Sequence, residues 1–152
     1  MVILDNLLTI EQAKELDKFR GQGQIKYHLN THPIIEYIFK EIEPYSQYPF
    51  KKNSTNTYYE VQHRENGHKY HYDTGSSQHM TWCGFSASSL LSNPIEFSGG
   101  LVKFDNQQVT PEEHHLSVIA YRSNEDERIN GHSVDKHDGM RIVLLMFIEC
   151  EE

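Results

Sequence analysis

The chain has 152 residues and a formal net charge of −8, and hydrophobic residues make up 37% of it. This length predicts one domain that is large enough to bury a core. The negative charge argues against a general electrostatic grip on duplex nucleic acid or on an anionic membrane. No apolar run approaches the roughly 20 residues of a transmembrane helix, and the N-terminus lacks the pattern of a signal peptide. Two cysteines, Cys83 and Cys150, give no disulfide framework, so we expect a cytoplasmic protein.

The first 45 residues have the periodicity of helices. Residues 9–12 match a capping box, and apolar residues then recur at helical spacing up to Gly21, which predicts a helix over 10–20. A second helix is expected from about Thr31 to Pro44, with one apolar stripe. Neither stripe carries reactive groups. We therefore expect this helical support, residues 9–43, to cover the back of a sheet.

From residue 55 the pattern changes to the alternation of strands. The expected strands are 55–64, 69–73, 81–92, 101–104, 116–122 and 140–149. Several short strands separated by turn residues indicate a sandwich or barrel. Two helices followed by strands give the α+β class. We predict a double-stranded β-helix (a jelly-roll or cupin-like fold) over 55–149, with both helices packed on its major sheet, and a single domain over 1–152.

The stretch His71-Tyr72-Asp73 contains two candidate metal ligands. On a strand, side chains two residues apart point to the same face. The best candidate for a third ligand is His132. Two histidines and one carboxylate, with the other coordination positions open, form the ligand set of non-haem Fe(II) oxygenases.

The last expected strand, 140–149, places Arg141 on the same face as three apolar residues. An arginine in line with core residues points into the barrel, and a buried guanidinium requires an anion. A protein carboxylate is one candidate for that anion. A carboxylate of a cosubstrate fits better, because Arg141 follows His132 by nine residues. We expect 135–139 to be a hairpin turn that returns Arg141 alongside the strand of His132.

Four segments, in this order, resemble the Fe(II)- and 2-oxoglutarate-dependent dioxygenases, and most closely their prolyl 4-hydroxylase-like branch. The segments are His71-x-Asp73, 97–104 with its paired glycines, Gly131-His132-Ser133-Val134, and Gly139-Met140-Arg141. The resemblance covers roughly 57–149. The ordered combination, with the nine-residue spacing from His132 to Arg141, is far more specific than H-x-D alone.

The resemblance implies an enzyme that hydroxylates a C–H bond and releases succinate and CO2, with a peptidyl proline as the expected substrate. His71, Asp73 and His132 are then the catalytic residues and the ligands of Fe(II). Arg141 binds the far carboxylate of the cosubstrate 2-oxoglutarate, which a planar guanidinium does well. The second substrate is O2, and ascorbate is the expected reductant.

Three further residues are predicted near 2-oxoglutarate. Members of the family carry a Tyr on the strand before H-x-D that contacts the cosubstrate. Counting back from His71 puts His63 at that position, with Tyr59 on the same face. Ser88 is expected to face the cosubstrate, and its alternative role is a small residue that allows close packing. Substrate specificity is expected to lie in the loops 43–54, 74–80 and 123–131.

Two alternatives stay open at this point. The same chemistry could act on a nucleobase or a small metabolite, or a cupin-like barrel could bind metal without turnover. Arg141 discriminates best, because a barrel that only binds metal does not need an inward arginine at that spacing. Of the other histidines, we expect His114, His115 and His137 to be exposed. The identity of the substrate and the oligomeric state stay undetermined.

Overall fold

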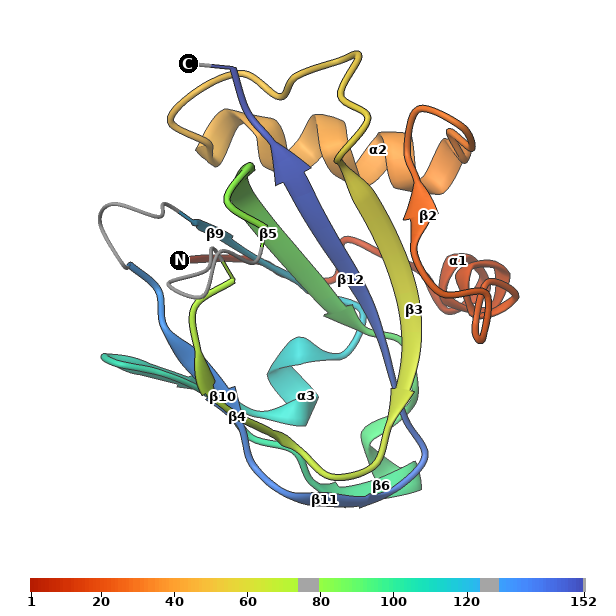
Figure 1. Cartoon of the computed structure of the whole chain (residues 1–152). Helices are drawn as coiled ribbons and strands as arrows, with labels where there is room; N and C mark the ends of the chain where they lie inside the picture. Colours follow the sequence, from red (N-terminus) through yellow and green to blue (C-terminus); the bar gives the residue numbers. More distant parts are fainter. Residues whose placement is uncertain (74–79, 124–128, 152) are drawn as a thin grey trace.

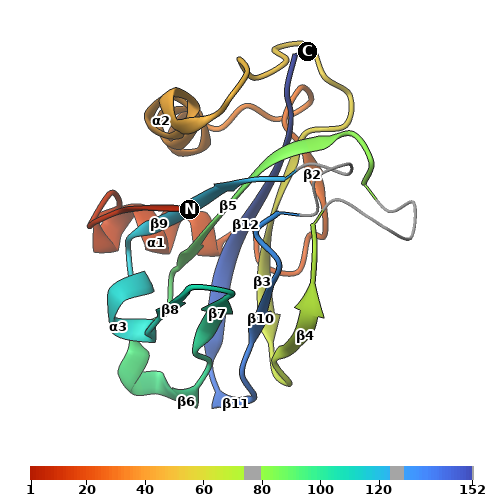
Figure 2. The ribbon, with the colours of Figure 1, turned by 90° about the vertical axis from the view of Figure 1, so that its left-hand side faces the viewer.

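A computed structural model describes residues 1–73, 80–123 and 129–151, and two sheets face each other across its interior (Figures 1 and 2). The large sheet has the strand order β1 (Val2–Leu4), β9 (Val118–Arg122), β5 (Cys83–Leu90), β12 (Arg141–Glu149), β3 (Tyr58–Arg64), β2 (Ile25–Lys26). The small sheet has the order β4 (His68–His71), β10 (His132–Val134), β7 (Val102–Phe104), β8 (Gln107–Val109). Their strands pair antiparallel. This arrangement confirms the predicted α+β class and double-stranded β-helix.

A short two-stranded ribbon lies at the base of the barrel. It consists of β6 (Phe97–Gly99) and β11 (His137–Gly139). The predicted hairpin turn at 135–139 is therefore wrong. This segment contains strand β11, and the chain passes through it from the small sheet to the large sheet. As a consequence, β10 belongs to the small sheet and β12 to the large one. Arg141 and His132 thus lie on different sheets rather than on adjacent strands.

The N-terminal segment forms the two predicted helices, α1 (Ile10–Asp17) and α2 (Pro33–Ile42). The capping box is present. The Thr9 hydroxyl accepts from the backbone N–H of Gln12, and the side-chain oxygen of Gln12 accepts from the backbone N–H of Thr9. Short helical turns follow at η1 (Glu43–Tyr45), η2 (Pro94–Glu96) and α3 (Pro111–His114). No helix among the described residues is long and apolar enough to cross a membrane.

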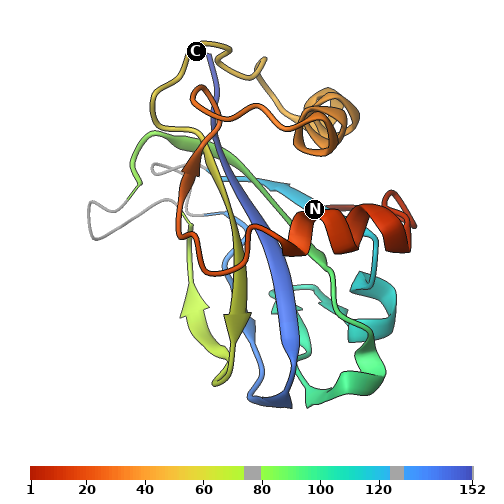
Figure 3. The same ribbon diagram turned by 90° about the vertical axis from the view of Figure 1, so that its right-hand side faces the viewer.

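The helices α1 and α2 pack on the face of the large sheet that points away from the small sheet (Figure 3). Leu16 of α1 and Ile38 of α2 are fully buried in this core. From β12 the core receives Ile142, Leu144, Met146 and Ile148. The alternate residues of the same strand, Arg141, Val143, Leu145 and Phe147, line the interior of the barrel. The predicted packing of both helices on the major sheet and the inward direction of Arg141 are confirmed.

This packing predicts a large stability cost for shortening a helix residue that faces the sheet. Ile38→Ala removes a fully buried side chain and should lower the free energy of unfolding by about 2–5 kcal/mol in urea titration. Tyr37→Ala, on the exposed side of the same helix, is the matched control and should cost far less. Equal costs for the two variants would contradict the packing of α2 on the sheet.

Candidate functional site

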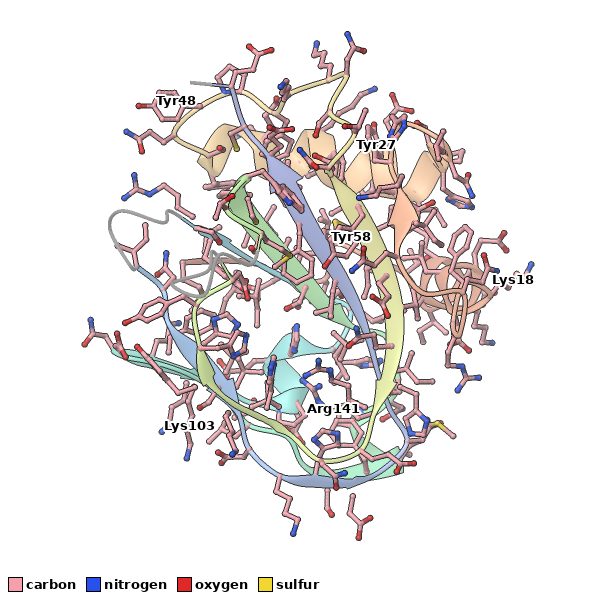
Figure 4. All side chains as sticks on the ribbon, in the orientation of Figure 1. Lys18, Tyr27, Tyr48, Tyr58, Lys103 and Arg141 are labelled. Atoms are coloured by element: carbon pink, nitrogen blue, oxygen red, sulfur yellow. The ribbon has the colours of Figure 1, made fainter. Side chains whose placement is uncertain are left out.

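A cavity of about 460 Å³ lies between the two sheets. Its walls come from both sheets and from α3, and it contains His71, Asp73, His132 and Arg141 together. Figure 4 shows Arg141 inside the barrel, whereas Lys18, Tyr48 and Lys103 lie at the periphery. A cavity of this size can hold a small organic ligand. The four residues with the most specific sequence signal are thus brought into one cavity.

Strand pairing in the small sheet places the two histidines side by side. His71 ends β4 and lies directly opposite His132, which begins β10, and their ring centroids are 4.4 Å apart. Asp73 follows two residues after His71 and is buried. Its Oδ1 lies 3.3 Å from Nε2 of His71 and 3.5 Å from Nε2 of His132. One ligand atom from each of the three residues lies within 4.8 Å of the others.

The backbone orients both imidazole rings. Nδ1 of His71 lies 2.8 Å from the carbonyl oxygen of Lys69, and Nδ1 of His132 lies 2.9 Å from that of Asn130. A carbonyl oxygen only accepts, so each Nδ1 carries the proton and donates it. The two Nε2 atoms therefore face the space beside Asp73, where loss of a proton frees a lone pair for a metal ion, as in metal-binding histidines.

The Asp73 carboxyl group is kept ionised in this buried position. Burial raises its pKa, but hydrogen bonding from His71 and the proximity of His132 outweigh burial, and the pKa lies below its ordinary value. A buried carboxylate beside two imidazoles provides one negative charge and three donor atoms. This set suits a first-row divalent metal ion that prefers mixed nitrogen and oxygen ligands.

Tyr121 of β9 is a member of the site that the sequence did not reveal. Its hydroxyl donates to Oδ2 of Asp73 at 2.5 Å and lies 3.2 Å from Nε2 of His132. Burial and the charge of Asp73 raise the pKa of this phenol well above its ordinary value, so it remains a donor. An aromatic residue within an apolar strand gives no signal of such a role. Only the opposition of the two sheets brings it to Asp73.

Arg141 is almost fully buried, with an exposed fraction of 3%. Its Nε has no hydrogen-bond partner among the described residues, and within this same part of the chain no carboxylate forms an ion pair with it. Burial, together with the charge of Arg64, lowers its pKa to about 10, so it stays a cation at neutral pH. Gly100 leaves room for this side chain, because an added Cβ would lie 3.1 Å from Nε of Arg141. The site therefore contains a buried cation without a described protein anion.

Ser88 lines the cavity, and its hydroxyl lies 3.1 Å from Nε2 of His114. His114 lies at the end of α3 with an exposed fraction of only 2%, so its predicted exposure is wrong. Burial and the charge of Arg141 lower the pKa of His114 to about 3, so the ring is neutral. His137 is also buried rather than exposed, and its Nε2 donates to the carbonyl oxygen of Arg64 at 2.6 Å. His115 is half-buried.

Tyr59 and His63 do not face the cavity, contrary to the prediction. Tyr59 is buried in the core beneath the helices, where its hydroxyl donates to the carbonyl oxygen of Asn30 at 2.9 Å. His63 is exposed on the same outer face of β3. The error arises because β3 and β4 belong to different sheets, so the alternation counted back from His71 does not continue through the intervening turn.

The residues of β3 that do face the cavity are the alternate ones. They are Tyr58, Glu60, Gln62 and Arg64. Strand register explains this set, because each lies opposite an inward residue of β12. Of the loops predicted to set specificity, 74–79 and 124–128 lie outside the described residues.

The comparisons with known proteins support the architecture. No family model matches the chain, and the search of curated proteins found no match. Among solved structures, the viral collagen prolyl hydroxylase of Paramecium Bursaria Chlorella virus-1, in its 2OG complex, is 13% identical with a TM-score of 0.69; the match covers 99% of this chain and 96% of that one. A Pseudomonas putida prolyl-4-hydroxylase is 10% identical with a TM-score of 0.64, with coverage of 99% and 92%.

A third solved structure is a prolyl hydroxylase from Trichoplax adhaerens in complex with a peptide of hypoxia inducible factor. It is 14% identical with a TM-score of 0.61, and the match covers 98% of this chain and 83% of that one. At these identities the likeness concerns the fold. The chain therefore has the double-stranded β-helix fold of solved prolyl hydroxylases over nearly its whole length.

The bond between Tyr121 and Asp73 predicts a stability effect without metal. Tyr121→Phe removes a donor to a buried carboxylate and should lower the free energy of unfolding of the metal-free protein by about 1.5–3 kcal/mol. Chemical denaturation measures this change. The control is Tyr45→Phe at an exposed position, which should change stability little. If the two variants matched wild type equally well, the phenol would not be holding Asp73.

His114 predicts a pH dependence of stability. Its pKa is about 3 when folded and near 6.5 in an unfolded chain, so between these values the unfolded state binds one more proton. The free energy of unfolding should therefore fall as the pH drops below 6.5. His114→Gln should remove up to about 1.4 kcal/mol per pH unit of that slope, measured by denaturation between pH 6.5 and 5. His28→Gln, at an exposed position, should keep the full slope; an unchanged slope in His114→Gln would contradict the buried neutral ring.

Proposed function

We propose that this protein is an Fe(II)- and 2-oxoglutarate-dependent dioxygenase that hydroxylates a C–H bond and releases succinate and CO2. The observation that carries the proposal is the pairing, in one cavity, of a buried His-Asp-His group with a buried arginine that has no described protein anion. The proposal takes residues 1–152 as one catalytic domain that works in the cytoplasm, with ascorbate as reductant.

The three donor residues fit iron in this role. His71 and His132 direct their Nε2 atoms, and Asp73 its ionised carboxylate, at a common point. The distances from each Nε2 to Oδ1 of Asp73 are 3.3 and 3.5 Å. These are close to the roughly 3 Å expected between two neighbouring ligand atoms that each lie about 2.1 Å from a metal ion. Two imidazoles and one carboxylate would hold the ion and leave coordination positions open for other ligands. Bound iron and 2-oxoglutarate would together supply the activation of O2.

The cavity also fits the cosubstrate. A dicarboxylate that binds iron at one end would place its far carboxylate toward Arg141, and a bidentate ion pair would supply the anion that this buried cation requires. Ser88 and His114 add neutral hydrogen-bonding groups on the same wall. Ser88 is therefore a proposed contact of 2-oxoglutarate. Tyr59 and His63 are not, because they lie on the outer face of β3, away from the cavity.

The chain's own residues would prepare the site before any ligand arrives. The carbonyl groups of Lys69 and Asn130 hold the two rings, and the Tyr121 hydroxyl holds the carboxylate of Asp73. Apolar residues cover much of the remaining wall and exclude water from the reacting atoms. They are Val102, Phe104, Val134, Val143, Leu145 and Phe147.

The proposed substrate is a peptidyl residue, with proline as the leading candidate. Support comes from the likeness to prolyl hydroxylases, one of which was solved with a peptide fragment bound. The aromatic rings of Tyr58 and Phe147 line the cavity, and their centroids are 5.2 Å apart. The ring of Trp82 lies beside that of Tyr58, with a centroid separation of 6.1 Å. Aromatic surfaces of this kind bind proline-containing segments well.

Anaerobic titration tests the proposal. Addition of Fe(II) and then 2-oxoglutarate should produce a visible charge-transfer band, because the cosubstrate would chelate the iron. Asp73→Ala or His71→Ala should abolish the band, while His28→Ala, which removes an exposed histidine, should keep it. No band in wild type, or one that survives both site substitutions, would refute the proposed metal centre.

Turnover is tested separately by release of succinate in the presence of O2. A panel of peptides with and without proline should show faster release with those that contain it. A normal band without release for any peptide would favour a different substrate class, such as a small metabolite, or a barrel that binds without turnover.

A further inference from the structure

Arg64 is a second arginine whose guanidinium lies in the cavity, and the proposed chemistry does not use it. It ends β3 and lies directly opposite Arg141, the first residue of β12, in the antiparallel register. Residues opposite each other share a face of the sheet, with Cβ atoms about 4.5–5.5 Å apart. Both side chains line the cavity.

Two like charges placed in this way repel each other. Directly opposed like charges destabilise a sheet, and burial of one of them strengthens the repulsion. The charge of Arg64 contributes to the lowered pKa of Arg141. No acidic side chain of residues 1–73, 80–123 or 129–151 forms an ion pair with Arg64 or Arg141. The pair is therefore best explained by an anion that comes from outside the chain.

Neighbouring residues hold Arg64 in place. Its Nε donates to Oε1 of Gln62 at 2.7 Å, and Gln62 also lines the cavity. Its carbonyl oxygen accepts from Nε2 of the buried His137 at 2.6 Å. A side chain and a backbone fixed from two directions are typical of a binding group rather than of a solvated surface cation.

We propose that Arg64 and Arg141 form a two-arginine clamp on the far carboxylate of 2-oxoglutarate, in which Arg64 adds a second guanidinium beside the ion pair with Arg141. This inference rests on the proposed function and concerns the choice of cosubstrate. Arg64 would make the contact with 2-oxoglutarate that was predicted for His63. In the family this contact is made by the neutral hydroxyl of a Tyr, so Arg64 would put a charge in its place. Selection for a charged far end would then be stronger, and more sensitive to salt, than with a single arginine.

The test compares two ligands that chelate metal in the same way. 2-Oxoglutarate and 2-oxopentanoate share the 2-oxo acid end and the chain length, but only the first has a far carboxylate. Calorimetric titration of the Mn(II)-loaded protein gives the ratio of their affinities. Arg64→Gln should reduce this ratio by about tenfold or more and leave the affinity for 2-oxopentanoate unchanged, as should Arg141→Gln. Arg64→Lys should restore part of the ratio.

The controls separate the clamp from general charge and from folding. Lys103→Gln removes a peripheral cation and should leave the ratio as in wild type (Figure 4). The melting temperature of ligand-free Arg64→Gln should rise, because one of two opposed charges is gone. A lower melting temperature together with lost affinity for both ligands would mark Arg64 as structural and overturn the clamp.

Two outcomes distinguish this inference from the proposed function. If Arg141→Gln lowers the ratio but Arg64→Gln does not, the clamp is wrong while the proposed function stands. If wild type binds neither ligand in the presence of Mn(II), the proposed function itself fails, and the clamp fails with it.

Discussion

The buried carboxylate of Asp73 is the contact on which the geometry of the cavity depends. It lies against His71 and His132 of the small sheet and accepts a hydrogen bond from Tyr121 of the large sheet. An ionised carboxylate inside a barrel is stable only if such partners surround it. The same contacts that keep it ionised also hold three donor atoms around one point. Stability of the barrel and readiness to bind a metal ion therefore have one physical origin.

The opposite requirement applies to the two arginines. Asp73 has its partners within the protein, whereas Arg141 and Arg64 face each other across a strand pair with no described protein anion. A fold tolerates this repulsion because β12 is anchored by its other face, where Leu144 and Met146 pack beneath the helices. The helices thus do more than cover the sheet, since the apolar core that they complete offsets the cost of a charged site on its reverse side.

Much of the site could be predicted from the sequence because the relevant signals are local. The two-residue spacing of His71 and Asp73, and the alternation that turns Arg141 inward, depend only on the geometry of a single strand. The failures arose where an inference had to pass from one strand to another. Counting from His71 to His63 and Tyr59 assumed one continuous sheet, and the turn between β3 and β4 breaks that count. The burial of His114 and His137 likewise depends on elements distant in sequence.

The sequence by itself determined the two N-terminal helices, the longer strands, three candidate ligands and one inward cation, because each follows from spacing along a single element. Only the tertiary structure decided which residues share the cavity with them. Register between β3 and β12 places Arg64 opposite Arg141, and the opposition of two sheets brings Tyr121 to Asp73. These contacts join residues 77 and 48 positions apart. Local periodicity carries no information over such distances, because strand register and sheet packing are set by the whole core.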